Sequence, residues 1–242
     1  MVVGILGPGR LGGSMAQLLR ARGYEVRTWS RGQQFPDCDV AWLTVSDHAI
    51  GPVAAALPVG PVVLHASGAT DLEPLQKHPE HGSLHPLQSF PGVEVSLPPV
   101  QDVPAAIAGT PEAKAIARRL ATDIGFHPFE VPGDRRLYHA AAVVAGNFGT
   151  TLLHAAAQLL ADAGVEAIEA PRLLAPLAIA SIRQAAEKGP AAALTGPHAR
   201  GDREVVAAHQ AAIDEVHPGL SALYTELSER TFELASCREE EG

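Results

Sequence analysis

The sequence contains little cysteine, little lysine and no long apolar run. Cys38 and Cys237 lie far apart in the chain, which argues against a disulfide framework or a metal site and favours a reducing cytoplasm. No segment is apolar over the length of about 18 residues that a membrane-spanning helix needs, so no membrane span is expected. Lysine occurs at three positions only: Lys77, Lys114 and Lys188.

The formal net charge of the 242 residues is −9. An acidic chain is repelled by phosphate backbones and by anionic lipid surfaces, which argues against nucleic acid or membrane as a partner. The length is sufficient for a sizeable core and for two small domains.

A glycine-rich turn follows the first predicted strand. Val2–Leu6 is apolar throughout, as is typical of a strand buried on both faces, and Gly7, Gly9 and Gly12 follow at the spacing G-x-G-x-x-G. In such a turn the first glycine permits a tight bend and the second lets the backbone approach a pyrophosphate. The third lets helix and strand pack closely. The alternative is a glycine turn with a purely structural role.

The residues after the turn complete a strand–helix–strand unit. A helix is predicted over Ser14–Arg22, Gly23 ends it, and a second strand is predicted over Tyr24–Trp29. The N-terminus of such a helix offers free N–H groups and the positive end of its dipole to phosphates. The turn is therefore predicted to bind a dinucleotide.

The end of the second strand indicates which dinucleotide is bound. An NAD site usually carries Asp or Glu at this point, to bind the ribose 2′-hydroxyl. This chain has Ser30, Arg31 and Gly32 instead, and a guanidinium binds a 2′-phosphate as a planar fork. NADP is therefore favoured over NAD, the alternative being that Arg31 is a solvated loop residue.

Strands and helices alternate up to residue 131. Further strands are predicted at 39–45, 61–65, 82–85, 105–108 and 126–131. Helices are predicted between them at 48–56, 72–77 and 111–124, the last with Thr110 as its N-cap. This alternation predicts an α/β fold with a doubly wound, mostly parallel Rossmann sheet over residues 1–133.

Strand signals end at Pro132-Gly133, and only helices are predicted beyond them. These helices are expected at 135–163, 168–188, 202–218 and 220–236, followed by a frayed charged tail at 238–242. Residues 134–242 are therefore predicted to form a second, all-α domain. Its apolar faces are too extensive for one small domain, so a homodimer built on them is expected.

Ligands of doubly wound sheets bind at the carboxyl ends of the strands. We therefore expect the cofactor to contact the glycine turn and the ends of the second, third and fourth strands. The expected cofactor-binding residues are Gly7, Gly9, Arg10, Leu11, Gly12, Ser30, Arg31, Ser46, Asp47, Ser67 and Gly68. Gln88, which follows the fifth strand, is a candidate for substrate binding. His85 nearby is a candidate catalytic residue, although Pro86 and Phe90 indicate a tightly built turn as much as a pocket wall.

A polar stripe interrupts the apolar surface of the long helix. At 100° per residue His139, Asn147 and His154 project within about a quarter turn of one another, beside Thr150 and Thr151. Buried polar groups need partners, and either a ligand or a facing helix of a dimer supplies them. Asn147 and His139 are therefore candidate catalytic residues.

A second group of polar residues lies in the Gly/Pro-rich connection 194–202. Arg200 is a candidate for binding a substrate carboxylate through two hydrogen bonds, with Thr195 beside it. The alternative is that Arg200 only staples the loop and that Asp202 caps the following helix.

These segments together resemble a known family. The residues that carry the resemblance are the glycine turn, Thr44–Asp47, His65–Gly68, Leu84–Phe90, Tyr138–Ala141, Asn147, Leu194–Pro197 and Arg200–Asp202. They resemble bacterial Rossmann-like proteins with a C-terminal helical domain of unknown function, similar to the 6-phosphogluconate-dehydrogenase-like superfamily. That superfamily includes pyrroline-5-carboxylate reductase, ketopantoate reductase and deazaflavin-dependent NADP reductases. The resemblance implies NADP-dependent reduction and dimerisation through the helical domain.

One departure from these relatives concerns the proton donor. The hydroxyacid and ketopantoate members carry a lysine one helical turn before the asparagine that Asn147 resembles, and Val143 stands there in this chain. His139 or His85 is then a candidate proton donor near neutral pH. The alternatives are reduction of an imine, or chemistry assisted by a group of the substrate, which need no lysine. The expected activity is NADP-dependent reduction of a small acidic carbonyl or imine metabolite, preferably a ketopantoate-like 2-oxo acid. The alternative is a dinucleotide-binding or sensing protein without catalysis.

Overall fold

The computed structural model describes residues 1–90, 92 and 100–240. The chain divides into two compact units, Met1–Gly146 and Asn147–Gly242. The predicted boundary after residue 133 lies at the change from strands to helices, because β7 (Phe126–Glu130) is followed by α4 (Arg135–Val143). The units themselves divide later, because α4 belongs with the sheet of the first unit.

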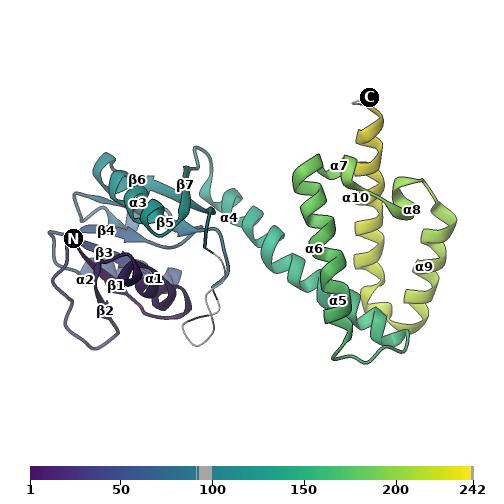
Figure 1. The fold of residues 1–242 in the computed structure, drawn as a ribbon, viewed down its shortest axis with the longest axis horizontal. Helices are drawn as coiled ribbons and strands as arrows, with labels where there is room; N and C mark the ends of the chain where they lie inside the picture. Colours follow the sequence, from purple (N-terminus) through teal and green to yellow (C-terminus); the bar gives the residue numbers. More distant parts are fainter. Residues whose placement is uncertain (91, 93–99, 241–242) are drawn as a thin grey trace. The chain divides into compact units, whose positions relative to one another are not determined.

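The first unit is built on a seven-stranded sheet in the order β2-β1-β3-β4-β5-β6-β7 (Figure 1). Its other strands are β1 (Val2–Leu6), β2 (Glu25–Trp29), β3 (Val40–Leu43), β4 (Val62–His65), β5 (His81–Pro86) and β6 (Val103–Gly109). The pair β5–β6 is antiparallel, and the other neighbouring pairs are parallel. This arrangement confirms the predicted mostly parallel, doubly wound sheet.

Alternation along the strands divides the core between the two faces of the sheet. On one face Ile5, Trp42 and Leu64 pack with α1 (Arg10–Ala21) and α3 (Pro111–Asp123). On the other face Leu6, Leu43 and Val63 pack with α2 (Asp47–Ala56). The sheet is thus covered on both sides, as its apolar strands predict.

Two local predictions in this unit have different outcomes. The hydroxyl of Thr110 accepts the backbone N–H of Ala113 at 3.4 Å, which confirms the predicted N-cap of α3. The helix predicted at 72–77 is only the short 3₁₀ helix η1 (Glu73–Leu75). Pro79 prevents this segment from continuing as a longer helix, because His78 before the proline is disfavoured in helical conformation.

The second unit is helical in its described part, as predicted. It contains η2 from Asn147 onward (η2 spans Val144–Phe148), α5 (Gly149–Asp162), α6 (Ala170–Lys188), α7 (Pro190–Ala193), α8 (Gly196–Ala199), α9 (Arg203–Val216), η3 (Pro218–Leu220) and α10 (Ser221–Glu240). Helix α10 continues to Glu240, into the segment for which fraying is predicted, and the fraying itself stays a prediction. The rest of that predicted tail lies outside the described residues.

The predicted long helix is present but contains an irregular turn. The segment η2 between α4 and α5 is a π-helix. Because π-helical hydrogen bonds join residues five apart, the turn is wider than an α-helical one, and the predicted 100° spacing from His139 to Asn147 does not hold. The expectation that the polar stripe interrupts a buried surface is also wrong within this chain, because Asn147 and His154 are exposed.

The stretch Arg135–Asp162 is long and apolar enough to cross a membrane by length and composition, with 28 residues and a mean hydropathy of 1.2. Within the 18-residue window of this stretch that has this hydropathy, only 11% is buried. The sequence predicts no membrane span, whereas the described residues contain one helix that passes the test of length and composition. Such a helix is weak support for a membrane, since helices that pack against another protein surface have the same composition.

Candidate functional site

The glycine turn after β1 has the geometry that its sequence predicts. Gly7 has a φ of +101°, which favours glycine, and its N–H donates to the carbonyl oxygen of Trp29 at 2.9 Å. A Cβ at Gly12 would lie 2.3 Å from the carbonyl oxygen of Gly7 and 2.3 Å from Thr44 Oγ1. Gly7 is therefore required by the bend, and Gly12 by the close packing of α1 on the strand ends.

The turn lies at a switch point of the sheet. From β1 the chain passes through α1 to β2 on one side, and β3 pairs with β1 on the other side. Thr44, directly after β3, donates its hydroxyl to the carbonyl oxygen of Gly7 at 2.8 Å. Ligands of doubly wound sheets bind in the crevice outside such a switch point.

The residues of the turn fit a dinucleotide. A Cβ at Gly9 would meet no atom of the described residues within 4 Å, so none of these residues blocks a ligand at this position. Helix α1 begins at Arg10, earlier than predicted, and this places the N–H groups of Arg10, Leu11 and Gly12 in its first turn. Such groups have no partner within the helix and are available to a phosphate.

Arg31 lies at the exposed tip of a tight turn after β2. The N–H of Gln33 donates to the carbonyl oxygen of Ser30 at 3.1 Å, and Gly32 has a φ of +90°. These features define a β-turn that needs glycine at its third position. Arg31 is exposed and forms no salt bridge within the described chain, so its guanidinium is open to an anion.

Ser46 and Asp47 begin α2 at the end of β3. Both are exposed, and Ser46 Oγ lies 3.3 Å from His48 Nε2 rather than capping the helix. They therefore belong to the same edge of the sheet as the glycine turn.

The loop after β4 is held from two directions. The N–H of Ser67 donates to His65 Nδ1 at 3.2 Å, and Arg135 Nη2 donates to the carbonyl oxygen of Ser67 at 2.9 Å. The hydroxyl of Ser67 accepts the N–H groups of Ala69 and Thr70. Ser67 therefore shapes the loop, and its side chain is already used within the protein.

His85, from β5, contacts two residues of α4. Its Nδ1 lies 2.7 Å from the hydroxyl of Tyr138, and its ring centroid lies 6.1 Å from that of His139. A Cβ at Gly68 would lie 2.8 Å from His139 Cδ2 and 2.9 Å from His85 Cε1. Gly68 thus allows the loop after β4 to approach both histidines.

The strand register explains this cluster. His65 pairs with Ser83, so His65 and His85 lie on the same face, two residues apart on neighbouring strands. Across β5, β6 and β7 the pairing continues from His85 through Ala106 to Phe129. The ring of Tyr138 contacts both His85 and Phe129, so α4 packs on this face.

The surroundings of His85 and His65 favour the neutral form of both imidazoles. Burial, followed by the charges of His139 and Arg135, lowers the pKa of His85 to about 4, although Asp47 acts in the opposite direction. Burial and the Arg135 guanidinium lower the pKa of His65 to about 3. A lowered pKa means that the neutral form of His85 predominates at pH 7, and the predicted role of His85 as a proton donor stays a prediction.

Sequence reasoning missed the positioning roles of Arg135 and Tyr138. Arg135 is buried, and burial lowers its pKa, whereas burial raises the pKa of Tyr138. Their spacing of three residues on one helix was a signal that both face the same surface, but only the packing of α4 on the sheet shows which surface.

The remaining predicted residues are not part of the histidine cluster. Gln88 is half-buried directly after β5, at the same edge of the first unit. Asn147 is exposed and begins the second unit, where its carbonyl oxygen accepts the hydroxyl of Thr151. Thr195 is also exposed, as N-cap of α8 without a side-chain cap hydrogen bond. Their roles stay predictions.

The contacts of Arg200 fit the alternative prediction, in which it holds the loop 194–202 together. Its Nε donates to the carboxylate of Asp202 at 2.8 Å, and both side chains lie in the connection before α9. The predicted capping of α9 by the Asp202 side chain is wrong, because this carboxylate makes no cap hydrogen bond. Arg200 thus staples the loop, and its role toward a substrate stays a prediction.

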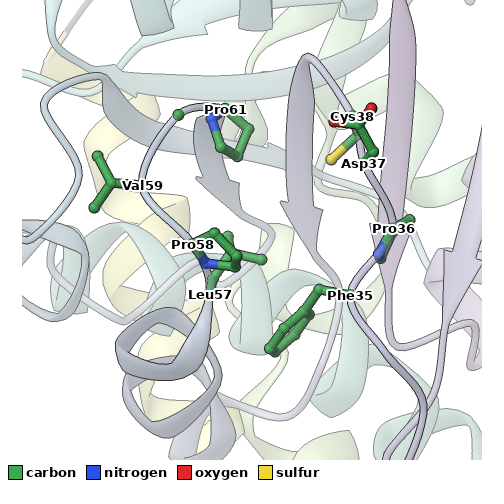
Figure 2. A pocket seen from close by; sticks show the side chains of 9 residues that line it. Phe35, Pro36, Asp37, Cys38, Leu57, Pro58, Val59 and Pro61 are labelled. Carbon is green, nitrogen blue, oxygen red and sulfur yellow. The ribbon is translucent and has the colours of Figure 1, made fainter.

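One cavity lies away from these residues. This cavity has a volume of about 320 Å³ and is lined by Phe35, Pro36, Asp37, Cys38, Leu57, Pro58, Val59, Gly60 and Pro61. Figure 2 shows side chains that line it. Cys38 and Pro61 precede β3 and β4, so the cavity lies at the amino ends of these strands. It lies at the edge opposite the glycine turn and contains none of the predicted site residues. The described residues contain no group of three or more His, Cys, Asp or Glu side chains placed to hold a metal ion.

The glycine turn, the switch point and the appended helices define a Rossmann-type protein with a helical second unit. Residues 103–231 match the family model described as Domain of unknown function (DUF2520), and since this is more than half of the chain, the chain belongs to that family. A comparison with curated protein sequences gives no match.

Three solved structures share this fold. One is a Bacteroides fragilis protein named as a candidate NADP oxidoreductase, with 20% identity, a TM-score of 0.80, and coverage of 96% of this chain and 98% of that chain. A Thermotoga maritima protein has 23% identity, a TM-score of 0.78, and coverage of 99% and 100%. The 1-pyrroline-5-carboxylate reductase of Streptococcus pyogenes has 15% identity, a TM-score of 0.65, and coverage of 97% and 98%. At these identities the likeness concerns the fold.

Proposed function

We propose that this protein is a cytoplasmic NADP-dependent reductase of a small acidic metabolite that carries a carbonyl or imine group. The observation that carries this proposal is the shared edge of the sheet. The glycine turn ends β1, the loop with Gly68 follows β4, and His85 is at the end of β5. A dinucleotide site and a cluster of hydrogen-bond donors thus lie at the carboxyl ends of strands in one sheet.

The cofactor would be held by this chain's own turns. Backbone N–H groups of Arg10, Leu11 and Gly12 would bind the phosphates, and the exposed guanidinium of Arg31 would bind a 2′-phosphate. The nicotinamide group, when bound, supplies the hydride for the reduction. The related fold of a protein named as a candidate NADP oxidoreductase supports this choice of cofactor.

The cluster favours a substrate with a negative charge and a polar acceptor. The buried guanidinium of Arg135 makes this edge positive, which attracts an anion. His85 and His139 both lie close to the backbone of Gly68, and their ring nitrogens are the polar groups that we propose for binding the substrate. A ketopantoate-like 2-oxo acid is our preferred substrate, and Asn147 and His139 are proposed to orient it.

The absence of a helix lysine favours a second candidate function. Residues 135–162 contain no lysine, and Val143 stands where the resemblance implies one. A dinucleotide-binding or sensing protein without catalysis has no need for that proton donor.

A screen of NADPH oxidation separates the two functions. The full-length protein is incubated with NADPH and, in turn, 2-oxo acids, cyclic imines and a deazaflavin, in air and without oxygen. Turnover with one of these classes supports a reductase. Tight NADPH binding without turnover of any of them supports the sensing protein, and absence of NADPH binding contradicts both.

We also propose a homodimer formed through the second unit. Helix α6 is apolar at many positions, yet Ala170 is its only buried residue. Leu173, Leu177 and Ile182 are each at least 60% exposed. Exposed apolar side chains on a helix are normally covered by another surface, and a second copy of this helix would cover them.

A further inference from the structure

The ring of His85 is enclosed by α4 on one side and by the loop after β4 on the other. Its Nδ1 lies 2.7 Å from the Tyr138 hydroxyl. Its Nε2 lies 3.1 Å from the position that a Cβ would take at Gly68. The two ring nitrogens therefore have different neighbours: a phenol at Nδ1, and the closely packed backbone of Gly68 near Nε2.

The neighbours of Tyr138 determine the direction of its hydrogen bond. A partly buried phenol normally donates its proton to an acceptor. The other groups described beside Tyr138 are the ring of Phe129 and the guanidinium of Arg135, and neither accepts a hydrogen bond of this kind. The phenol therefore donates to His85 Nδ1, and the proton of the neutral imidazole is on Nε2.

We propose that Tyr138 is a positioning residue that holds His85 as the Nε2–H tautomer, and that this N–H is a hydrogen-bond donor to the carbonyl or imine group of the substrate. The inference that a substrate accepts this hydrogen bond rests on the proposed reductase function. The tautomer itself does not depend on that function.

The charges around His85 fit a neutral donor. His139 and Arg135 on α4 disfavour the imidazolium form, as burial does, and only Asp47 at the start of α2 favours it. A neutral imidazole can polarise an acceptor through its N–H without giving up the proton. The proton that completes a reduction would then come from another group or from water.

The tautomer is measured directly by long-range ¹H–¹⁵N NMR correlation on the full-length protein labelled with ¹⁵N-histidine. His85→Gln identifies the His85 signals by their loss. At pH 7 we expect Nε2 to be protonated, with at least about a tenfold excess over the Nδ1–H form, the scale of one net hydrogen bond. Tyr138→Phe is expected to bring the two tautomers toward equal populations.

A second His–Tyr pair is a matched control. His209 Nδ1 lies 2.9 Å from the hydroxyl of Tyr224, within the second unit. Tyr224→Phe should leave the His85 signals unchanged. A wild-type His85 protonated on Nδ1, or on both nitrogens at pH 7, would overturn the proposal.

The substrate contact has its own test. If the NADPH screen identifies a substrate, Tyr138→Phe should lower kcat about tenfold with little change in NADPH affinity. An unchanged kcat would contradict the hydrogen bond to substrate. A protein with the Nε2–H tautomer but no turnover would refute the reductase function alone.

Discussion

The two units bury their apolar side chains very differently. The largest fully buried side chains of the described residues, among them Trp42, Met15 and Leu64, all lie in the first unit. The buried apolar residues of the second unit are Ala157, Ala170, Val206 and Ile213. Buried apolar area sets the hydrophobic stabilisation, so this stabilisation is greater in the first unit than in the second.

We therefore expect the two units to differ in function. The first unit holds the glycine turn and the histidine cluster on a rigid sheet, as a precise binding site requires. The second unit presents apolar helices that a second copy is proposed to cover. Asn147, at its first position, is the predicted contribution of the second unit to the chemistry.

The largest expected effect is on assembly. Replacing two exposed apolar residues of α6, in Leu177→Asp combined with Ile182→Asp, should convert a dimer into a monomer, because two charges per copy would be buried in the interface. Light scattering at micromolar concentration measures this. The matched control is Val59→Asp in the first unit, also more than half exposed, which should leave the dimer intact. A wild-type monomer would refute the dimer, and material recovered only with detergent or lipid would favour a membrane for these helices.

The next effect concerns acid stability of the first unit. The folded-state pKa of His85, about 4, is below its ordinary value of 6.5, so its contribution to stability is fully present above pH 6.5. This contribution is lost as the pH falls from 6.5 to about 4 and amounts to about 3 kcal/mol. His85→Gln should therefore lose less free energy of unfolding than wild type between pH 7 and 4, as measured by urea denaturation. His154→Gln, at an exposed position of the second unit, should behave as wild type. Identical pH dependence in all three proteins would refute the neutral buried imidazole.

Asn147 tests whether the second unit takes part in the reaction. If it orients the substrate, Asn147→Ala should lower turnover about 100-fold and leave NADPH binding and melting temperature nearly unchanged. If Asn147 is purely structural, Asn147→Ala should lower the melting temperature and impair NADPH binding and turnover together. Steady-state kinetics with calorimetry distinguish these outcomes.

Two glycines of the turn are expected to respond differently. A Cβ at Gly12 would lie 2.3 Å from Gly7 O and from Thr44 Oγ1, so Gly12→Ala should cost about 1–3 kcal/mol of stability and abolish NADPH binding. Gly9→Ala meets no atom of the described residues within 4 Å and should fold normally, while its methyl group weakens binding of a pyrophosphate. Equal NADPH affinity in wild type and Gly9→Ala would place the phosphates elsewhere.

The sheet could be predicted from the sequence because its signals are local. The run Val2–Leu6 forms β1 with the predicted bounds, and the residues around Thr110 specify a cap. The histidine cluster could not be predicted from local signals, because His85 and Tyr138 are far apart in sequence. Only strand register and the packing of α4 bring them together. The π-helical turn Val144–Phe148 was not predicted either, since its apolar residues fit a regular helix equally well.

The central proposal is that the glycine turn binds the pyrophosphate of NADP. Arg31, in the turn after β2, is proposed to bind the 2′-phosphate and so to select NADP over NAD. Calorimetric titration of wild type and Arg31→Ala with NADPH and NADH tests it most directly. We predict that wild type binds NADPH more tightly than NADH by about 1–3 kcal/mol, the scale of a charge-assisted pair, and that Arg31→Ala removes the difference. Equal affinities of wild type for the two cofactors, or no binding of either, would contradict it.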